Sequence, residues 1–131
     1  MASVVDVSQV EALAQDYTTA SGRVGRVGRK ALQAEAESVH EIQVAHVRAT
    51  ANPTGDLESH LIINMRGDGR ATGLSVWVGS DGGEENGHGA FLEEGTARMP
   101  AQPWNAPAAD AAEKSWPDRA ESLMTEVTSG L

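Results

Sequence analysis

The sequence feature that most constrains the fold is a break at Asn52-Pro53-Thr54-Gly55. Proline disfavours helical backbone in the residue before it, and glycine permits a tight turn. Apolar residues recur at helical spacing before this break, and they alternate as in a strand soon after it. The chain therefore divides into an N-terminal helical part and a β part that follows it.

Two helices are expected before the break. Ser8-Gln9-Val10-Glu11 has the spacing of a capping box, in which the serine and glutamate side chains satisfy backbone N–H groups, and it predicts a helix from about residue 8 to residue 20. Ser21-Gly22 is expected to interrupt it. A second helix is predicted over residues 30–49. Its apolar stripe consists of Leu32, Ala36, Val39 and Ile42.

Between these helices, residues 22–30 repeat Gly-Arg-Val at a period of three. Each glycine weakens a helix by roughly 1 kcal/mol relative to alanine, which indicates a loosely helical, solvated joint. Arginines at this spacing also form one stripe on a helix, so the segment is alternatively a basic strip that docks an acidic neighbour or a phosphate backbone. The residues of this basic strip are Arg23, Arg26, Arg29 and Lys30.

The β part is predicted to be a hairpin. Residues 60–66 and 72–79 are the strands, and Gly67-Asp68-Gly69 is the turn. The face directed at the helices is expected to carry Leu61, Ile63, Met65, Leu74, Val76 and Val78. Trp77 then lies on the opposite face, which indicates that a partner covers this face as well.

The rest of the chain is predicted to be a loop, an extended segment and a helix. Residues 80–89 are rich in glycine and acid, and they predict a long exposed loop that reaches a neighbour or a lumen. Two prolines hold residues 99–104 extended. Asn105 is expected to cap a final helix that kinks or restarts at Pro117 and ends near residue 128. The candidate lumen residues of the loop are Asp81, Glu84 and Glu85.

This order of elements predicts an α+β fold, in which a small antiparallel sheet, a β-hairpin core, is packed by the N-terminal and C-terminal helices. A chain of 131 residues is expected to form a single domain, residues 1–131, with an N-terminal arm at residues 1–7. Only 4% of the residues are aromatic, so few large side chains are available to fill a core. A partner surface would therefore add stability.

The formal net charge of −9 argues against a nucleic-acid binder, which needs a basic surface, and against binding to an anionic membrane. The absence of cysteine excludes disulfides, thiolate nucleophiles and cysteine-ligated metals. No apolar run approaches the ~20 residues of a membrane span, and the first ten residues do not have the pattern of a signal peptide. Synthesis in the cytoplasm without a membrane partner is expected.

The sequence predicts no enzyme, no cofactor and no metal. His40 and His46 are six residues apart, which would place them about 240° apart around a helix, so they cannot share a metal ion there. The adjacent acids Glu84-Glu85 and Glu93-Glu94 fall in loop-like sequence and are expected to be solvated. The glycines of residues 22–28 lack the preceding strand and the Gly-Lys-Ser/Thr of a phosphate-binding loop.

Three segments together resemble one protein family. The first is Pro53-Thr54-Gly55-Asp56-Leu57 with the following Ser59-His60-Leu61, the second is residues 92–104 with Glu93-Glu94-Gly95-Thr96, and the third is Pro103-Trp104-Asn105-Ala106-Pro107 before a long helix. In order and spacing, over about residues 25–128, they are similar to the HK-ninety-seven gene-product-ten-like neck, or tail-completion, proteins of tailed phages. Glu94 stands where that family usually has an aromatic residue, and Trp104 stands in place of phenylalanine.

The resemblance implies a virion structural protein, made in the host bacterial cytoplasm. It would form a homo-oligomeric ring, of six copies, at the head–tail junction and leave a channel through which DNA passes without sequence-specific binding. Its partners would be a head-completion or adaptor protein and a tail terminator or tail tube protein. The alternatives are a tail terminator or minor tail protein of the same virion, a small cytoplasmic enzyme, or an antitoxin-like binding module.

The second segment is also a candidate interface. Gly95 permits a turn, the Thr96 hydroxyl can bond local backbone, and the prolines hold the chain extended, so Trp104 would be presented to a neighbour on a rigid ledge. A role in the core alone is the alternative, and core filling is likewise the alternative for Trp77. The candidate interface residues outside the basic strip are Trp77, Gly95, Thr96, Met99, Pro100, Pro103 and Trp104.

Overall fold

The computed structural model describes residues 7–51, 53–67 and 74–129. It confirms the α+β class, because a two-stranded antiparallel sheet is flanked by N-terminal and C-terminal helices. The helices are α1 (Val7–Arg48), α2 (Asp56–Ser59), α3 (His88–Glu94) and α4 (Ala106–Thr128), with a short 3-10 helix η1 (Glu85–Gly87) before α3. The strands are β1 (Leu61–Arg66) and β2 (Ser75–Ser80).

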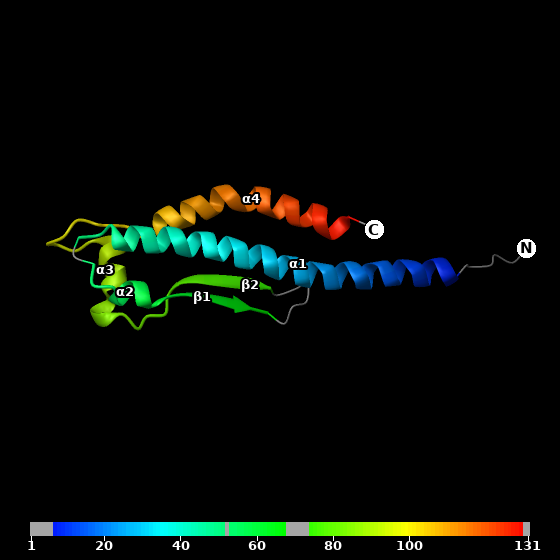
Figure 1. Ribbon diagram of the computed structural model, residues 1–131, viewed down its shortest axis with the longest axis horizontal. Helices are drawn as coiled ribbons and strands as arrows, with labels where there is room; N and C mark the ends of the chain where they lie inside the picture. The colour runs from blue at the N-terminus through cyan, green and yellow to red at the C-terminus, as the bar shows by residue number, and fades with distance from the viewer. Residues whose placement is uncertain (1–6, 52, 68–73, 130–131) are drawn as a thin grey trace, which may run out of the picture.

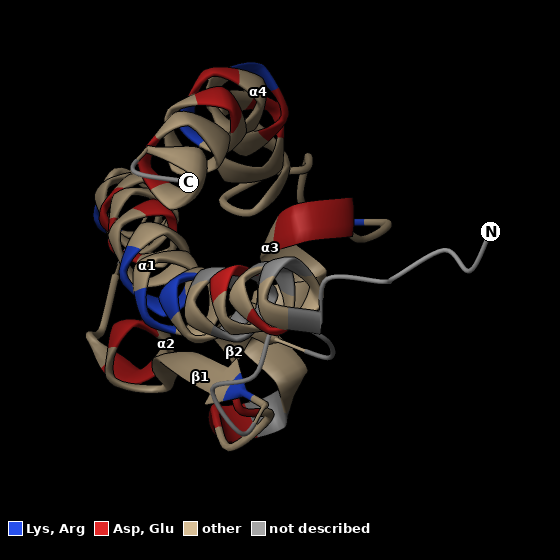
Figure 2. Cartoon of the chain, turned by 90° about the vertical axis from the view of Figure 1, so that its right-hand side faces the viewer, with Lys and Arg blue, Asp and Glu red and all other residues tan. Residues whose placement is uncertain are grey.

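The elements form three layers around α1, which is the spine of an elongated molecule (Figure 1). α4 packs along one side of α1, and the β1–β2 hairpin packs along the other, so the order of the layers is α4, α1, sheet (Figure 2). The end of α4 lies beside Arg23, whose guanidinium donates to the backbone oxygens of Val127 and Ser129. The part of α1 before Arg23 extends beyond the other two layers (Figure 1).

α1 is one continuous helix of 42 residues, roughly 63 Å long, so the expected interruption at Ser21-Gly22 is wrong. The capping-box residue Ser8 also lies inside the helix rather than before it. The loss of helix propensity at the glycines is offset by packing, which supplies most helical stability in proteins. Gly25 and Gly28 are buried, and a Cβ atom on Gly28 would lie 3.4 Å from the Leu74 side chain. Gly28 therefore marks where the segment before β2 approaches α1 closely.

The hairpin has the expected faces. The strands are in register up to the pair of Arg66 with Ser75. Of the predicted turn Gly67-Asp68-Gly69, the structure describes Gly67 alone. Asp68, Gly69, Thr72 and Gly73 lie outside the described residues. The predicted inner face is confirmed in β1 and β2, because Leu61 is buried and Val76 and Val78 are half-buried. Trp77 lies on the outer face and is 46% exposed.

Residues 80–89 are not a long free loop, which corrects the prediction. They include η1 and the start of α3, and they are fixed to neighbouring elements. The Glu85 N–H donates to the Asp56 carboxylate at 2.7 Å, and His60 Nδ1 lies 2.9 Å from Asp81 Oδ1. Glycine and acid content indicated a loop because a two-turn helix held by distant side chains has little local signal of its own.

The core lies at one end of the molecule, where the last turns of α1 meet α2, β1 and α3. Its members are Val47, Leu57, Leu61, Leu92 and Trp104, and Val44 and Met99 pack against them. Towards the other end, the layers are joined by polar contacts as well. The buried Glu35 of α1 accepts hydrogen bonds from Arg119 Nε at 2.6 Å and from Ser115 Oγ at 2.5 Å, both in α4.

α4 runs unbroken through Pro117, so the helix does not restart near Asp118, which was one of the two predicted alternatives. The helix is arched along α1 (Figure 1). Asn105 holds the predicted N-cap position of α4, but the expected side-chain capping is not found. Its backbone is already helical, with φ −93° and ψ −41°, and its side chain makes no capping hydrogen bond. Instead Asn105 Oδ1 accepts a hydrogen bond at 2.9 Å from Nε2 of the buried Gln43.

Candidate functional site

The segment of residues 95–104 is a folded connection between α3 and α4. Gly95 has φ 78° and ψ 175°, a conformation open almost only to glycine, and a Cβ atom there would lie 2.8 Å from the Ala101 nitrogen. The Thr96 hydroxyl accepts the N–H groups of Arg98 and Met99, as its expected local role requires. The Gln102 N–H donates to the Leu92 oxygen at 2.7 Å, which closes the connection onto α3.

Trp104 is a core residue and not a ledge for a neighbour. It is 7% exposed, packs in the core, and its indole N–H donates to the Gly89 oxygen at 2.8 Å. Met99 is half-buried against the same core, whereas Thr96, Pro100 and Pro103 are exposed. The block therefore serves the core through Trp104 and offers only its outer turn as a surface.

Glu93 holds this block together, a role that was not predicted from the sequence. Its carboxylate accepts the backbone N–H groups of Trp104 at 2.9 Å, Asn105 at 2.8 Å and Ala106 at 2.9 Å. These are donors that the first turn of a helix leaves without partners, and a carboxylate there also interacts favourably with the helix dipole. Glu94 is exposed. Sequence alone does not distinguish these two adjacent glutamates. The placement of α3, which contains both, decides which one points at α4.

The basic strip divides into residues with and without partners inside the chain. Arg23 binds the C-terminal carbonyls of α4, and Arg29 donates to the Gly67 oxygen at 3.2 Å. Arg26 and Lys30 are exposed, and neither has a hydrogen bond or ion pair within the described parts of the chain. Two of the four cations are therefore available to another molecule.

The outer sheet face, meaning Ile62, Asn64, Arg66, Ser75, Trp77 and Gly79, is the side of the hairpin turned away from α1. The Trp77 ring lies over Gly79, where a Cβ atom would come within 3.1 Å of the indole. Gly79 is buried beneath the ring although it belongs to the outer layer. The sequence prediction that Trp77 faces away from the helices agrees with its 46% exposure.

The candidate lumen residues belong to a fixed acidic corner near the core end. Asp81 and Glu85 are exposed, and Glu84 is half-buried, where it accepts the Ser80 hydroxyl. His60 lies between two carboxylates, with Nδ1 2.9 Å from Asp81 and Nε2 3.8 Å from Asp56. No group of three or more histidine and acidic side chains suited to a metal ion occurs among the residues that the structure describes.

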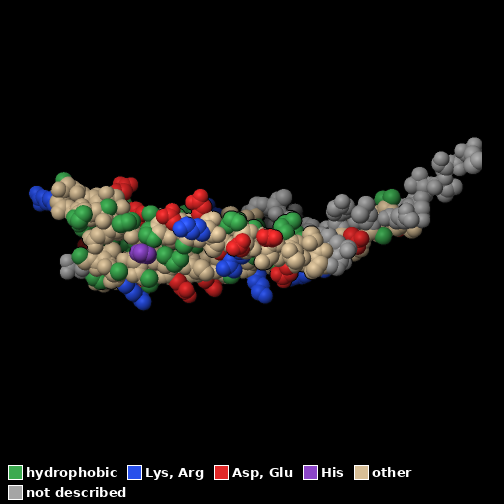
Figure 3. Space-filling model, turned by 90° about the horizontal axis from the view of Figure 1, so that it is seen from above, with side chains coloured by type: hydrophobic (Ala, Val, Ile, Leu, Met, Phe, Trp, Pro, Cys, Tyr) green, Lys and Arg blue, Asp and Glu red, His purple; other side chains and the backbone are tan. Residues whose placement is uncertain are grey.

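The outer face of α4 was not anticipated as a surface. Met124 projects from it and is 60% exposed, and Asp110, Glu113 and Glu121 on the same side are exposed as well. Figure 3 views the molecule from this side and shows acidic and apolar side chains together along it. The signal available in the sequence was the excess of acid over base between residues 106 and 128.

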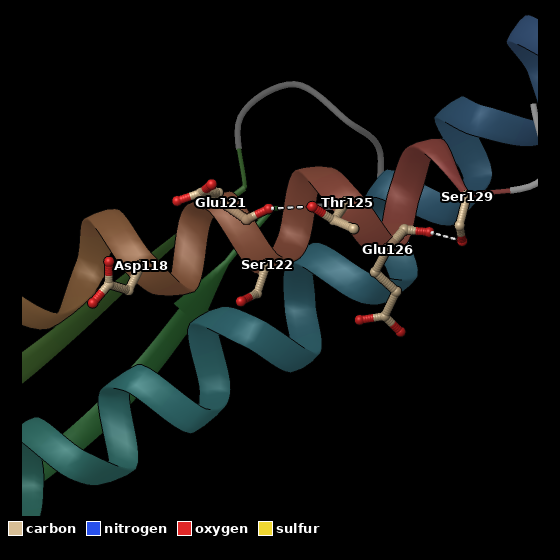
Figure 4. Close-up of a pocket in the computed structure, with 6 residues that line it drawn as sticks. All are labelled: Asp118, Glu121, Ser122, Thr125, Glu126 and Ser129. Atoms are coloured by element: carbon tan, nitrogen blue, oxygen red, sulfur yellow. Dashed lines mark hydrogen bonds between the residues drawn. The ribbon is translucent and has the colours of Figure 1, made fainter.

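The hollows of the surface are open grooves. One of about 570 Å³ runs along the second half of α4 and is bounded by Asp118, Glu121 and Glu126 (Figure 4). The Thr125 hydroxyl within it donates to the Glu121 backbone oxygen, and the Ser129 hydroxyl donates to that of Glu126. Both hydroxyl hydrogens are therefore bonded to the backbone of α4 itself. A second groove of about 410 Å³ lies between α1, α2 and β1, beside the Arg48–Glu58 ion pair.

None of the helices in the described ranges is both long and apolar enough to cross a membrane. Comparisons of the chain with protein-family models, with curated proteins and with solved structures gave no match.

Proposed function

We propose that the protein is a structural subunit of a tailed-phage virion that assembles with copies of itself into a ring at the head–tail junction. The ring joins head to tail and leaves a channel for DNA. The proposal rests first on the resemblance of residues 53–61 and 92–107 to the neck and tail-completion proteins. Its location is accordingly the virion, with head-completion and tail proteins as neighbours.

The observation that carries the proposal is the size and position of the core. Within the described residues, the buried hydrophobic side chains are eight, and four of them are alanine or valine in helices. The core cluster sits at one end of a long molecule. Large apolar side chains remain uncovered on the surface: Val10, Trp77, Phe91 and Met124 are each 46% to 60% exposed. A small domain with this distribution gains stability when copies cover its surfaces.

Charge fits the channel proposed for DNA. The chain carries a net charge of −9, and the exposed acids Asp81 and Glu85 form part of a fixed corner. Carboxylates around a channel repel the phosphate backbone, so DNA passes without adhering. Within the basic strip, Arg26 and Lys30 are the exposed cations without a partner in the described residues, and they remain for a protein neighbour with an acidic surface.

The mass of the purified chain tests the proposal. Light scattering after size exclusion, and native mass spectrometry, should detect a closed oligomer, with six copies of the 13.7 kDa chain as the expected species. Negative-stain images of the same sample should show rings with a central hole. A chain that stays monomeric at concentrations on the order of 100 µM would rule out the ring as an intrinsic property of the protein.

The neighbouring genes give an independent test. A ring subunit of the head–tail junction should be encoded beside head-completion and major tail proteins. A position within an operon of metabolic enzymes, with no virion genes near it, would favour the small cytoplasmic enzyme instead.

A further inference from the structure

The two outer layers of the molecule each leave one face uncovered. Because α1 lies between α4 and the hairpin, the outer sheet face and the outer face of α4 point in opposite directions (Figure 2). Each face has a large exposed apolar side chain, Trp77 at 46% on the sheet and Met124 at 60% on α4. Tryptophan and methionine are both enriched in interfaces between proteins relative to the rest of the surface.

The outer sheet face carries an exposed indole, that of Trp77, and one cation, Arg66. Trp77 lies opposite Asn64 in the register, so Ile62 and Arg66 are its diagonal neighbours on β1. The indole lies over Gly79, which lacks a side chain that would lift the ring from the sheet. Arg66 is exposed and has no ion pair within the described ranges. This face thus offers an aromatic surface beside a cation.

The outer face of α4 has the opposite character. Glu121 lies three residues before Met124, which places the two side chains on one side of the helix. Pro117, one further helical repeat back, is also exposed on this side. Glu121 has no ion pair in the described part of the chain, and Figure 4 shows its carboxylate directed away from α1. This face therefore presents the apolar side chain of Met124 beside the carboxylate of Glu121.

We propose that the outer sheet face of one copy of this chain receives the outer face of α4 of the next copy. Met124 then packs on the Trp77 indole, a favourable contact between sulfur and an aromatic ring, and Glu121 pairs with Arg66. This rests on the proposed function, for which it supplies the contact between subunits. The two faces differ and lie on opposite layers, so the contact is heterologous. Its repetition closes a ring when a whole number of copies completes one full turn.

Two single substitutions test the pairing. W77E places a charge on the sheet face and leaves α4 intact, whereas M124E does the reverse. Each variant alone should lose the oligomer, with a rise in dissociation constant of about 30-fold or more, the effect of removing a hot-spot side chain. Circular dichroism should show unchanged helix content in both.

A mixture of the two variants decides the matter. The intact sheet face of M124E can bind the intact α4 face of W77E, and no further copy can join either end. A 1:1 heterodimer should therefore form, visible in native mass spectrometry when one variant carries a mass label. A contact that used the same patch on both copies would give no such heterodimer.

F91E is the matched control, because Phe91 is 50% exposed but belongs to α3 at the core end, away from both faces. It should leave the oligomer unchanged. Rings that still form in both the W77E and the M124E variants would overturn this pairing and leave the ring function standing. A wild-type chain without any oligomer would overturn both.

Discussion

The carboxylate of Glu93 lies 2.9 Å from the backbone nitrogen of Trp104 and accepts its hydrogen bond. The same carboxylate accepts the next two N–H groups, so one side chain of α3 satisfies the start of α4. Trp104, which supplies the first of these three N–H groups, also has its side chain in the core. Glu93 thus fixes the direction in which α4 leaves the core.

Glu93→Gln should destabilise the fold strongly. The amide keeps one acceptor oxygen but loses the charge and the second oxygen, so at least one N–H group loses its partner. The expected loss is about 2–3 kcal/mol of unfolding free energy, measured by urea titration. Glu94→Gln is the control, because Glu94 is exposed, and it should change stability by less than about 0.5 kcal/mol. Equal effects of the two substitutions would show that the capping contact does not stabilise α4.

Arg23→Gln should weaken the end of α4, whereas Arg26→Gln should not. The Arg23 guanidinium meets the last carbonyls of α4, where a cation also interacts favourably with the helix dipole, so its loss should cost about 1 kcal/mol. Hydrogen exchange at residues 124–129 should speed up in the Arg23 variant alone. An equal change in both variants would indicate general charge effects and no specific contact.

Gly95→Ala should disrupt the connection between α3 and α4. An added Cβ atom meets the Ala101 nitrogen at 2.8 Å and the Met99 oxygen at 3.1 Å, and the backbone conformation disfavours any side chain. The expected cost is about 2–3 kcal/mol in thermal or urea unfolding. Gly22→Ala is the control, since Gly22 is exposed in α1 with open space around it, and it should raise helix content. A Gly95→Ala variant as stable as the wild type would contradict the position of Ala101.

Acid should weaken the contact between α1 and α2. The hydrogen bond from Arg48 lowers the pKa of Glu58 below its ordinary value. A lowered folded-state pKa contributes stability above the unfolded pKa of about 4.3, and this contribution is lost as the pH falls through the folded value. Glu58→Gln should therefore flatten the pH dependence of stability below about pH 5. NMR titration of the Glu58 carboxyl measures the pKa directly, and an ordinary value would contradict the contact.

The alternation around Trp77 and the break at residues 52–55 were sufficient to predict the hairpin faces and the α+β class. These signals are local. The alternation of side chains between the two faces of a strand is visible within six residues, and proline restricts the backbone of the residue before it. The faces of Trp77 and Val78 follow from one alternation. Nothing further along the chain was needed to place them.

Local signals failed where distant contacts decide the structure. The glycines of residues 22–28 predicted a joint, but Gly28 packs against Leu74, and α1 continues through them. Trp104 could be placed in a core or on a ledge with equal reason until α3 and α1 were positioned around it. Residues 80–89 became helical in part because Asp56 and His60, more than twenty positions earlier, hold them.

The pairing of α1 with α4 sets the order in which the chain can fold. Arg23 and Val127 are 104 positions apart, whereas the strands of the hairpin are close in sequence and can pair early. Closing the segment between α1 and α4 costs more chain entropy than closing the hairpin, so the α4 layer is expected to join last. During synthesis the side of α1 that α4 covers, with Val27, Ala31 and Ala34, stays open to water and to other nascent chains. The docking of α4 is thus the step that covers this side of α1.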